Sequence, residues 1–262
     1  KRLAACLCGR ISSRMGETVR RHFKEQVSAR MEESAGMMRL DKFLADMGQG
    51  TRSELKKKIR SGLVTVDGVP VCRPEQKIEE TVQKVCIDGR AVSYELHVYY
   101  MMNKPAGVIT ATKDGREQTV LQLLSPEDRR KGLFPVGRLD RDTTGLLLLT
   151  DDGPLGHRLL SPSRHVAKTY EAVVEGRATE EWRHAFAEGM DIGDEKPTLP
   201  AQLEILEAGE LSRIRITLRE GRFHQIKRMC QAMGAPVRRL RRLSMGGLRL
   251  DESLGPGEYR RL

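Results

Sequence analysis

The sequence lacks any uninterrupted apolar run of about 18 residues, the minimum that a membrane-spanning helix needs. Residues 1–5 carry two positive charges, but no long apolar region follows them. We therefore expect neither a transmembrane helix nor a cleaved secretory signal. The sequence also contains no internal repeat and no low-complexity tract, which excludes solenoid and fibrous architectures.

Cysteine is scarce: the five cysteines are scattered and odd in number. This usage indicates reduced thiols in the cytoplasm rather than a disulfide framework. Cys6, Cys8 and His22 suggest part of a metal site, but a closed zinc site needs a full tetrahedral ligand set, and no second Cys or His pair follows at a suitable spacing. No glycine-rich phosphate loop is present either. We expect no metal and no nucleotide cofactor.

Positive charge is in excess, with 46 Lys and Arg against 36 Asp and Glu, a net charge of +10 and a pI of about 9.6. A balance this basic favours a polyanion such as nucleic acid as partner, although solubility alone is a competing explanation. The 262 residues, 39% of them hydrophobic, suffice for one large domain or two smaller ones.

The patterning divides the chain into three segments. Residues 1–37 are charged and show no strand pattern, so we expect an extension that is disordered or weakly helical around 19–33 and dispensable for folding. Residues 38–95 predict a small α+β unit. Residues 96–262 alternate strand-like and helical runs and predict a larger α+β domain.

The small unit carries clear local signals. Helical spacing of apolar residues begins at Leu40 and ends at Gly48, and Thr51-Arg52-Ser53-Glu54 has the form of a capping box that starts a second helix. Asp67-Gly68 lies between β-branched runs and predicts a hairpin, and a strand over 82–87 leads into a second Asp-Gly turn.

The second helix has a strongly basic face, which predicts contacts to RNA phosphates rather than sequence reading. The alternative is a plain solvated face. The segments 39–44, 51–53 and 59–68 together resemble the S4 RNA-binding domain, named after a small-subunit ribosomal protein. The residues assigned to RNA binding are Arg39, Arg52, Lys56, Lys57, Lys58 and Arg60.

In the large domain, strands are predicted over 98–102, 107–110, 145–150, 168–174, 201–206 and 214–218, and helices over 121–124, 154–160, 180–188 and 224–233. Asp140 lies between two apolar runs, where a carboxylate can be held and partly desolvated. A plain turn explains the same pattern. Asp142 raises a further alternative, a paired-acid glycosidase, although glycosidases draw their acids from opposite sides of the sugar.

Four motifs in this domain resemble those of pseudouridine synthases. They are Gly137–Asp140 with Thr144–Thr150, Met102–Gly107, Lys168–Tyr170 and Gly221–Met229. The resemblance implies a mixed, mainly antiparallel sheet and an isomerase that converts uridine in RNA to pseudouridine without metal or cofactor. Residues Phe223–Lys227 and the ending Gly257–Arg260 look most like the branch acting on 16S ribosomal RNA.

Two other functions stay open beside this one: a 23S ribosomal RNA synthase, and a non-catalytic ribosome assembly factor that binds RNA. In each case we expect a cytoplasmic monomer whose partner is ribosomal RNA.

The resemblance also assigns residues. Asp140 takes the part of the catalytic carboxylate, acting on ribose or uracil or through a glycal route. Lys227 pairs with it and keeps it ionised. Tyr170 packs on the target base.

Substrate contacts are expected at Arg138, which props the place of the flipped nucleotide or binds its phosphate, and at Ile226 on the pocket floor. Lys104 and Arg222 are assigned to substrate binding as well. His224 is expected to be structural or to contact RNA, and Asp142 to be a solvated turn residue.

Overall fold

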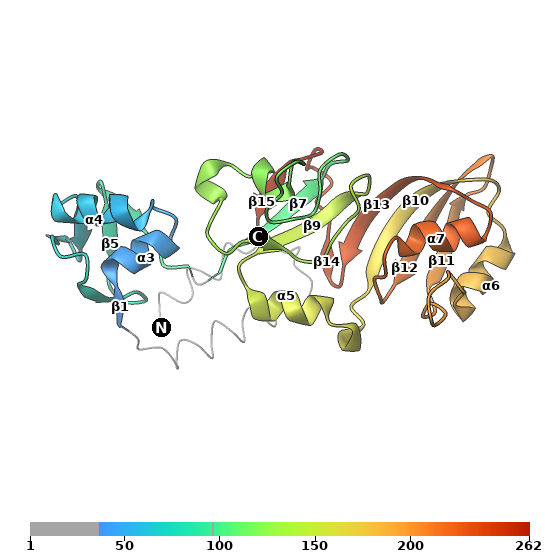
Figure 1. The fold of residues 1–262 in the computed structure, drawn as a ribbon, viewed down its shortest axis with the longest axis horizontal. Coiled ribbons are helices and arrows are strands. Elements are labelled where there is room, and N and C mark those ends of the chain that lie inside the picture. The colour runs from blue at the N-terminus through green and yellow to red at the C-terminus, as the bar shows by residue number, and fades with distance from the viewer. Residues whose placement is uncertain (1–36, 96) are drawn as a thin grey trace. The chain divides into compact units, whose positions relative to one another are not determined.

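The computed structural model describes residues 37–95 and 97–262 (Figure 1). Its contacts divide this part of the chain into two compact units, one of residues up to 98 with 124–133, the other of 99–123 and 134–262. The expected extension, apart from Met37, and the candidate metal ligands Cys6, Cys8 and His22 lie outside the described residues. Within the described part, no helix is long and apolar enough to cross a membrane.

The small unit packs two helices on a sheet. The helices are α3 (Leu40–Asp46) and α4 (Arg52–Arg60); the sheet runs β3 (Val69–Pro70), β2 (Val64–Val66), β5 (Val85–Ile87), β6 (Arg90–Val92), and β1 (Met37–Arg39) pairs with β4 (Lys77–Glu79). Phe43, Leu55 and Ile59 from the helices and Val64 and Val85 from the sheet are at most 1% exposed and form one apolar core. This unit also includes the short 3₁₀ helix η2 (Pro126–Asp128).

The local signals of the small unit are confirmed. Thr51 Oγ1 accepts from the Glu54 amide while the Glu54 carboxylate accepts from the Thr51 amide at 2.8 Å, so both halves of the capping box are formed. Both Asp-Gly turns place both residues at positive φ, with Asp67 at 52° and Gly68 at 84°. This conformation suits two-residue hairpins. Only residues 85–87 of the strand predicted over 82–87 are extended in the sheet, because 80–83 form a turn.

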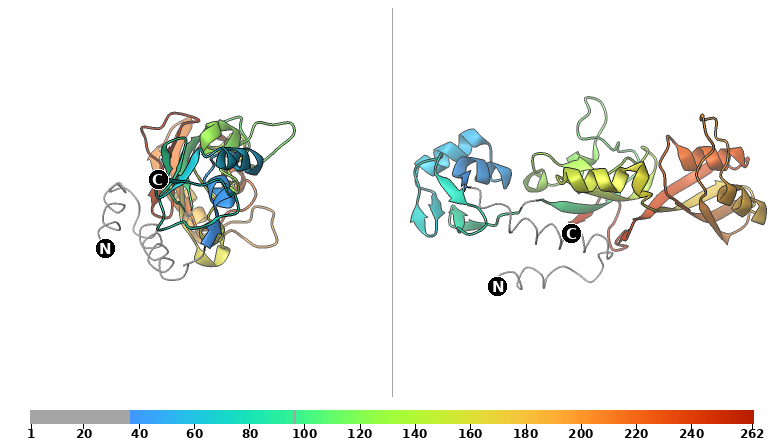
Figure 2. Two further views of the ribbon diagram at one scale, coloured as in Figure 1. Left: turned by 90° about the vertical axis from the view of Figure 1, so that its left-hand side faces the viewer. Right: turned by 90° about the horizontal axis from the view of Figure 1, so that it is seen from below.

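The large unit is built on one nine-stranded sheet in the order β11-β12-β10-β13-β9-β7-β15, with β14 on β13 and β8 on β9 (Figure 1, Figure 2). The strands are β7 (Tyr99–Lys104), β8 (Phe134–Pro135), β9 (Thr144–Thr150), β10 (Lys168–Glu175), β11 (Gln202–Glu207), β12 (Leu211–Leu218), β13 (Val237–Met245), β14 (Leu248–Arg249) and β15 (Tyr259–Arg261). All pairs are antiparallel except β13 with β9. The sheet is therefore mixed and mainly antiparallel, as expected.

Two apolar clusters hold the helices against this sheet. Helices α6 (Glu180–Glu188) and α7 (Gln225–Ala232) cover one face of β11, β12, β10 and β13, and α5 (Gly153–Leu160) packs near β9. Phe186 and Met229 are fully buried against Ile214 and Ile216. The alternating buried positions of β10 and β12 explain why these strands were predictable.

Several elements of the large unit differ from prediction. Strand β13, at nine residues the longest described, was missed, as were the short strands β8, β14 and β15. Residues 107–110 form no strand but a loop with a single bridge from Ile109 to Thr119. Residues 121–124 contribute to a 3₁₀ helix, η1 (Val120–Leu123), instead of an α-helix.

The parallel contact between β9 and β13 depends on Gly145. Its φ is 99°, and a side chain there would collide with the backbone carbonyl of Arg242. Buried Arg242 in turn donates from Nε to the Leu146 carbonyl at 2.7 Å. This close approach joins the two halves of the sheet directly after the loop that carries Asp140.

Candidate active site

Asp140 lies in a tight loop between β8 and β9. The Thr143 amide donates to the Asp140 carbonyl at 3.1 Å, and Leu139 is fixed by Thr110, whose hydroxyl donates to the Leu139 carbonyl at 2.8 Å. The Gly107 amide donates to the Arg141 carbonyl at 2.8 Å. The loop at 105–110, of which residues 107–110 were mispredicted as a strand, therefore braces the loop that presents the carboxylate.

Lys104 is the buried anchor of this arrangement. Its side chain is 0% exposed, and its ammonium donates to the carbonyls of Pro105 (2.9 Å), Arg141 (3.2 Å) and Thr143 (2.9 Å). Three bonds use all the donors of an ammonium group. In this structure Lys104 is fully buried and holds the loop, whereas the sequence predicted a contact to substrate.

The ammonium of Lys227 lies between two carboxylates. Its Nζ is 3.1 Å from Asp140 Oδ2 and 2.6 Å from Asp142 Oδ1, and only 24% of the Lys227 side chain is exposed. The predicted pair of Lys227 and Asp140 is therefore present. Asp142, expected to be a solvated turn residue, is 72% exposed yet makes the shorter contact.

The electrostatics of this cluster favour the charged forms of Asp142 and Lys227 but not that of Lys104. Burial opposes the charge of Asp142, but the hydrogen bond and charge of Lys227 outweigh it and hold the Asp142 pKa below its usual value. Burial likewise opposes the charge of Lys227, but its bonds to Asp142 and Asp140 raise the pKa of Lys227. Burial lowers the pKa of Lys104 to about 8, although the charges of Asp142 and Asp140 oppose that shift.

An apolar wall completes the site. Tyr170 on β10 is 8% exposed and belongs to the same cluster as Leu139, beside Asp140, and Ile226, beside Lys227. His224 Nε2 lies 3.5 Å from Asp140 Oδ1. The His224 contact was not predicted, because no spacing rule ties it to Asp140.

The other residues predicted to bind substrate differ in their surroundings. Arg138 is exposed on the loop of Asp140, with no ion pair in the described structure, which fits a contact to RNA. Ile226 is 5% exposed in the wall. Arg222 instead donates to the carbonyls of Lys196 and Pro197 at 2.6 and 2.7 Å. Its guanidinium is therefore engaged within the protein, and its assignment to substrate stays a prediction.

The basic residues of the small unit also divide. Lys58 pairs with Asp88 at 2.9 Å, and Arg39 makes two bonds to Asp41 at 3.0 Å. The other cations assigned to RNA, which make no ion pair in the part of the chain described, are Arg52, Lys56, Lys57 and Arg60.

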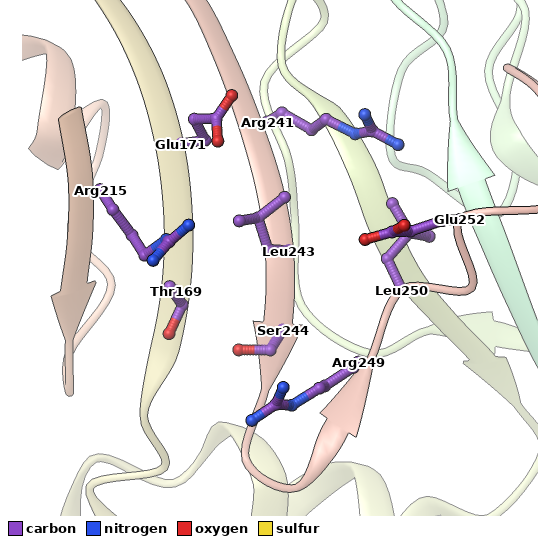
Figure 3. Close-up of a pocket in the computed structure, with 9 residues that line it drawn as sticks. All are labelled: Thr169, Glu171, Arg215, Arg241, Leu243, Ser244, Arg249, Leu250 and Glu252. Atoms are coloured by element: carbon purple, nitrogen blue, oxygen red, sulfur yellow. The ribbon is translucent and has the colours of Figure 1, made fainter. Parts of the chain in front are cut away.

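A separate groove of about 600 Å³ lies on the face of the large sheet that points away from Tyr170 (Figure 3). Glu171 faces it, one residue after Tyr170, so the alternation of β10 places the two side chains on opposite faces. Arg215 and Arg241 line its sides and Leu243 its floor. The groove is thus not the site that contains Asp140.

The family profile described as RNA pseudouridylate synthase matches residues 98–232, which include all the residues of this site. The chain belongs to the RNA pseudouridylate synthase family. It is accordingly an isomerase that acts on RNA. The S4 domain profile matches residues 38–84, which identifies the small unit as an S4 RNA-binding domain.

Relatives resemble the chain over most of its length. It is 46% identical to the uncharacterized RNA pseudouridine synthase YtzG of Bacillus subtilis, over 86% of this chain and 95% of that protein. It is 41% identical to ribosomal small subunit pseudouridine synthase A of Escherichia coli, over 86% and 96%. A crystal structure of a pseudouridylate synthase matches with a TM-score of 0.60 and 39% identity, over 86% of this chain and 96% of that one.

Proposed function

We propose that this synthase isomerises one specific uridine of 16S small-subunit ribosomal RNA, with Asp140 as its catalytic carboxylate. The observation that carries the proposal is the pairing of Asp140 with Lys227 at 3.1 Å in a braced, partly exposed loop. Its similarity to small-subunit synthases of Escherichia coli and Vibrio cholerae, at 41% and 42% identity, supports 16S RNA as substrate.

The reaction breaks the bond between ribose C1′ and uracil N1, turns the base, and joins C1′ to uracil C5. The C5 proton leaves and N1 gains a proton, so the product is an isomer of the substrate. An ionised carboxylate suits this sequence, because it can attack as a nucleophile or stabilise positive charge on the ribose. The ammonium of Lys227, 3.1 Å from Asp140 Oδ2, places a positive charge beside that carboxylate.

The arrangement of the two acids argues against the glycosidase alternative. A glycosidase places its acid and base about 5 Å or more apart on either side of the sugar. Asp140 and Asp142 instead lie in the same loop, and both contact the single ammonium group of Lys227. The pairing of Asp140 with Lys227 also argues against an inactive relic, since the charged residues of the proposed site are still present and in contact.

The test is to map pseudouridines in 16S and 23S RNA from cells with and without this protein. We expect one 16S position to lose its pseudouridine, and to regain it when an unmodified 16S transcript is treated with the purified protein. A loss confined to 23S RNA would favour the large-subunit alternative. Unchanged maps of both RNAs would contradict the proposal.

A further inference from the structure

Phe223 exposes most of its aromatic ring to solvent. Its side chain is 76% exposed. The other exposed large apolar residues in the described part of the chain are aliphatic: Met37, Leu63, Val69, Val82, Leu160, Leu199 and Leu211. A single exposed aliphatic residue needs no explanation, but an exposed aromatic ring beside a catalytic carboxylate indicates a surface for binding.

The backbone that carries Phe223 is held in place. The Arg228 guanidinium donates to the Phe223 carbonyl at 3.3 Å. Buried Gln225 accepts from the Arg222 amide at 3.0 Å and donates to Glu220 at 2.6 Å. The ring is thus presented by a loop whose main chain is already fixed before any ligand binds, which lowers the entropy lost on binding.

Arginine side chains tie this loop to a neighbouring one. Arg222 donates to the carbonyls of Lys196 and Pro197, and Arg222 and Arg228 both pair with Asp194, at 3.4 and 2.7 Å. The guanidinium of Arg222 is thus engaged within the protein. The two arginines hold the platform on which the neighbouring ring stands.

The ring is also close to the reacting groups. Phe223 stacks on His224 with centroids 3.9 Å apart and planes at 18°. His224 is in the left-handed region, at a φ of 48°, and its Nε2 lies 3.5 Å from Asp140 Oδ1. A non-glycine residue in this region is uncommon and is found where surrounding contacts impose it. One face of Phe223 is thus covered by the His224 ring, while most of its surface is open.

We propose that Phe223 forms a stacking site for a nucleobase of the substrate RNA other than the target uridine. Taking a uridine out of its stack leaves neighbouring bases without a partner. An exposed aromatic ring replaces that lost stacking, and it accepts any base because every base has a π face. The target base itself has to reach Asp140, beside which Tyr170 forms the wall.

The inference rests on the proposed role of Asp140, because that residue fixes where the target uridine lies. Phe223 has no group that exchanges protons or bonds with the uridine. Its loss is therefore expected to weaken RNA binding while leaving the chemical step nearly intact. This pattern separates a stacking residue from a catalytic one.

The test compares Phe223→Ala, Phe223→Leu and Phe223→Trp in the full chain, with Leu211→Ala as the matched control, since Leu211 is 57% exposed and lies on β12. The probe is whichever unmodified transcript, 16S or 23S, the wild-type protein modifies, cut to the shortest active fragment. We expect Phe223→Ala to raise Kd and KM by about tenfold with kcat changed less than about twofold. Phe223→Trp should bind with an affinity close to that of the wild type. Phe223→Leu should bind weakly, whereas the control Leu211→Ala should bind like the wild type.

A second readout locates the base. 2-Aminopurine is placed in turn at each position around the target uridine, and its fluorescence is measured on binding. We expect one position to be quenched by the wild type and by Phe223→Trp but not by Phe223→Ala. Wild-type affinity in Phe223→Ala or in Phe223→Leu would overturn the inference, as would a collapse of kcat at unchanged affinity. Modification of 23S instead of 16S would overturn only the proposed substrate, since stacking is then tested on the 23S fragment.

Discussion

At the scale of single residues, Lys104 decides whether the catalytic loop has one conformation. From a fully buried position it reaches the backbone carbonyl of Pro105 and those of Arg141 and Thr143, which follow Asp140 in its loop. Replacing it with methionine keeps the volume but leaves those carbonyls without donors. We expect Lys104→Met to lower the free energy of unfolding by about 2 kcal/mol, measured by urea denaturation.

The same variant should lose at least about 100-fold in kcat, because the carboxylate is no longer held in the productive geometry. Its affinity for RNA should stay close to that of the wild type, since Lys104 touches no solvent. A variant that is destabilised but fully active would show that the loop is held by its other contacts alone, such as the bond between Gly107 and Arg141.

The pKa of Lys104 also predicts a pH dependence. Its value of about 8 lies below the ordinary 10.5. Between these two values the folded protein binds fewer protons at this group than the unfolded chain, so linkage makes folding more favourable as the pH rises. Activity should move the other way, because a neutral amine has lost one of the donors that hold the loop.

We therefore expect kcat to fall as the pH rises through about 8, while this group causes no loss of stability. The raised pKa of Lys227 keeps that residue charged across the same range. The measurement is kcat from pH 6.5 to 9.5, with thermal unfolding on the same samples. A flat kcat over the whole range would contradict the assignment.

At the scale of elements, helix α4 should supply affinity and not chemistry. Lys57 and Lys58 are adjacent, but Lys58 is paired with Asp88 and Lys57 has no ion pair among the described residues. We expect Lys57→Ala to weaken RNA binding and to reduce the slope of log Kd against log salt concentration by roughly 0.7–0.9.

Lys58→Ala, the matched control, should change that slope less, and neither variant should alter kcat. A triple variant with Lys56, Lys57 and Arg60 changed to glutamate should reduce the salt slope by about the sum of the reductions that the single variants cause. An unchanged salt slope in the triple variant would assign the RNA to another surface of the protein.

The elements that could be predicted from the sequence are those whose signals are local. The capping box at Thr51, the two Asp-Gly turns and the alternating strands β10 and β12 depend on neighbouring residues only. Strand β13 reads Val-Arg-Arg-Leu-Arg-Arg-Leu-Ser-Met, with apolar residues three apart. That spacing does not alternate, and pairing with β10 and β9 overrides it.

The site could be predicted only where its residues belong to recognisable motifs. The pairing of Asp140 with Lys227 followed from the resemblance of their motifs. Three contacts could not be predicted, because each joins segments that are distant in sequence. They are the ion pair of Asp142 with Lys227, the bonds of Lys104 to the loop, and the contact of His224 with Asp140. Lys227 and Asp142 are 85 residues apart in the sequence, and Lys104 and Arg141 are 37 apart. No spacing rule predicts a contact over such separations.

At the scale of the whole molecule, the S4 domain and most of the synthase domain form separate compact units. The S4 domain has its own core, with Phe43, Leu55 and Val64 at most 1% exposed. We expect a fragment of residues 37–98 to fold, as judged by NMR amide dispersion, and to bind ribosomal RNA in a salt-dependent way without isomerising it. An unfolded fragment would mean that residues 124–133, which belong to the same unit, are needed to complete it.

The central claim is that Asp140, and not its neighbour Asp142, carries the chemistry. Asparagine keeps the shape of the side chain and removes its charge, and Asp142→Asn is a control on the same loop that shares Lys227. The exposed Asp142 can be lost while Lys227 still pairs with Asp140, so we expect a fall in kcat of about tenfold or less for that variant.

The most direct measurement is tritium release from uracil C5 in a 16S fragment, run beside a binding assay on the same preparations of wild type, Asp140→Asn and Asp142→Asn. The account predicts that Asp140→Asn folds and binds RNA almost normally but releases no detectable tritium, while Asp142→Asn retains measurable release. Normal release by Asp140→Asn, or complete loss in both variants, would contradict it.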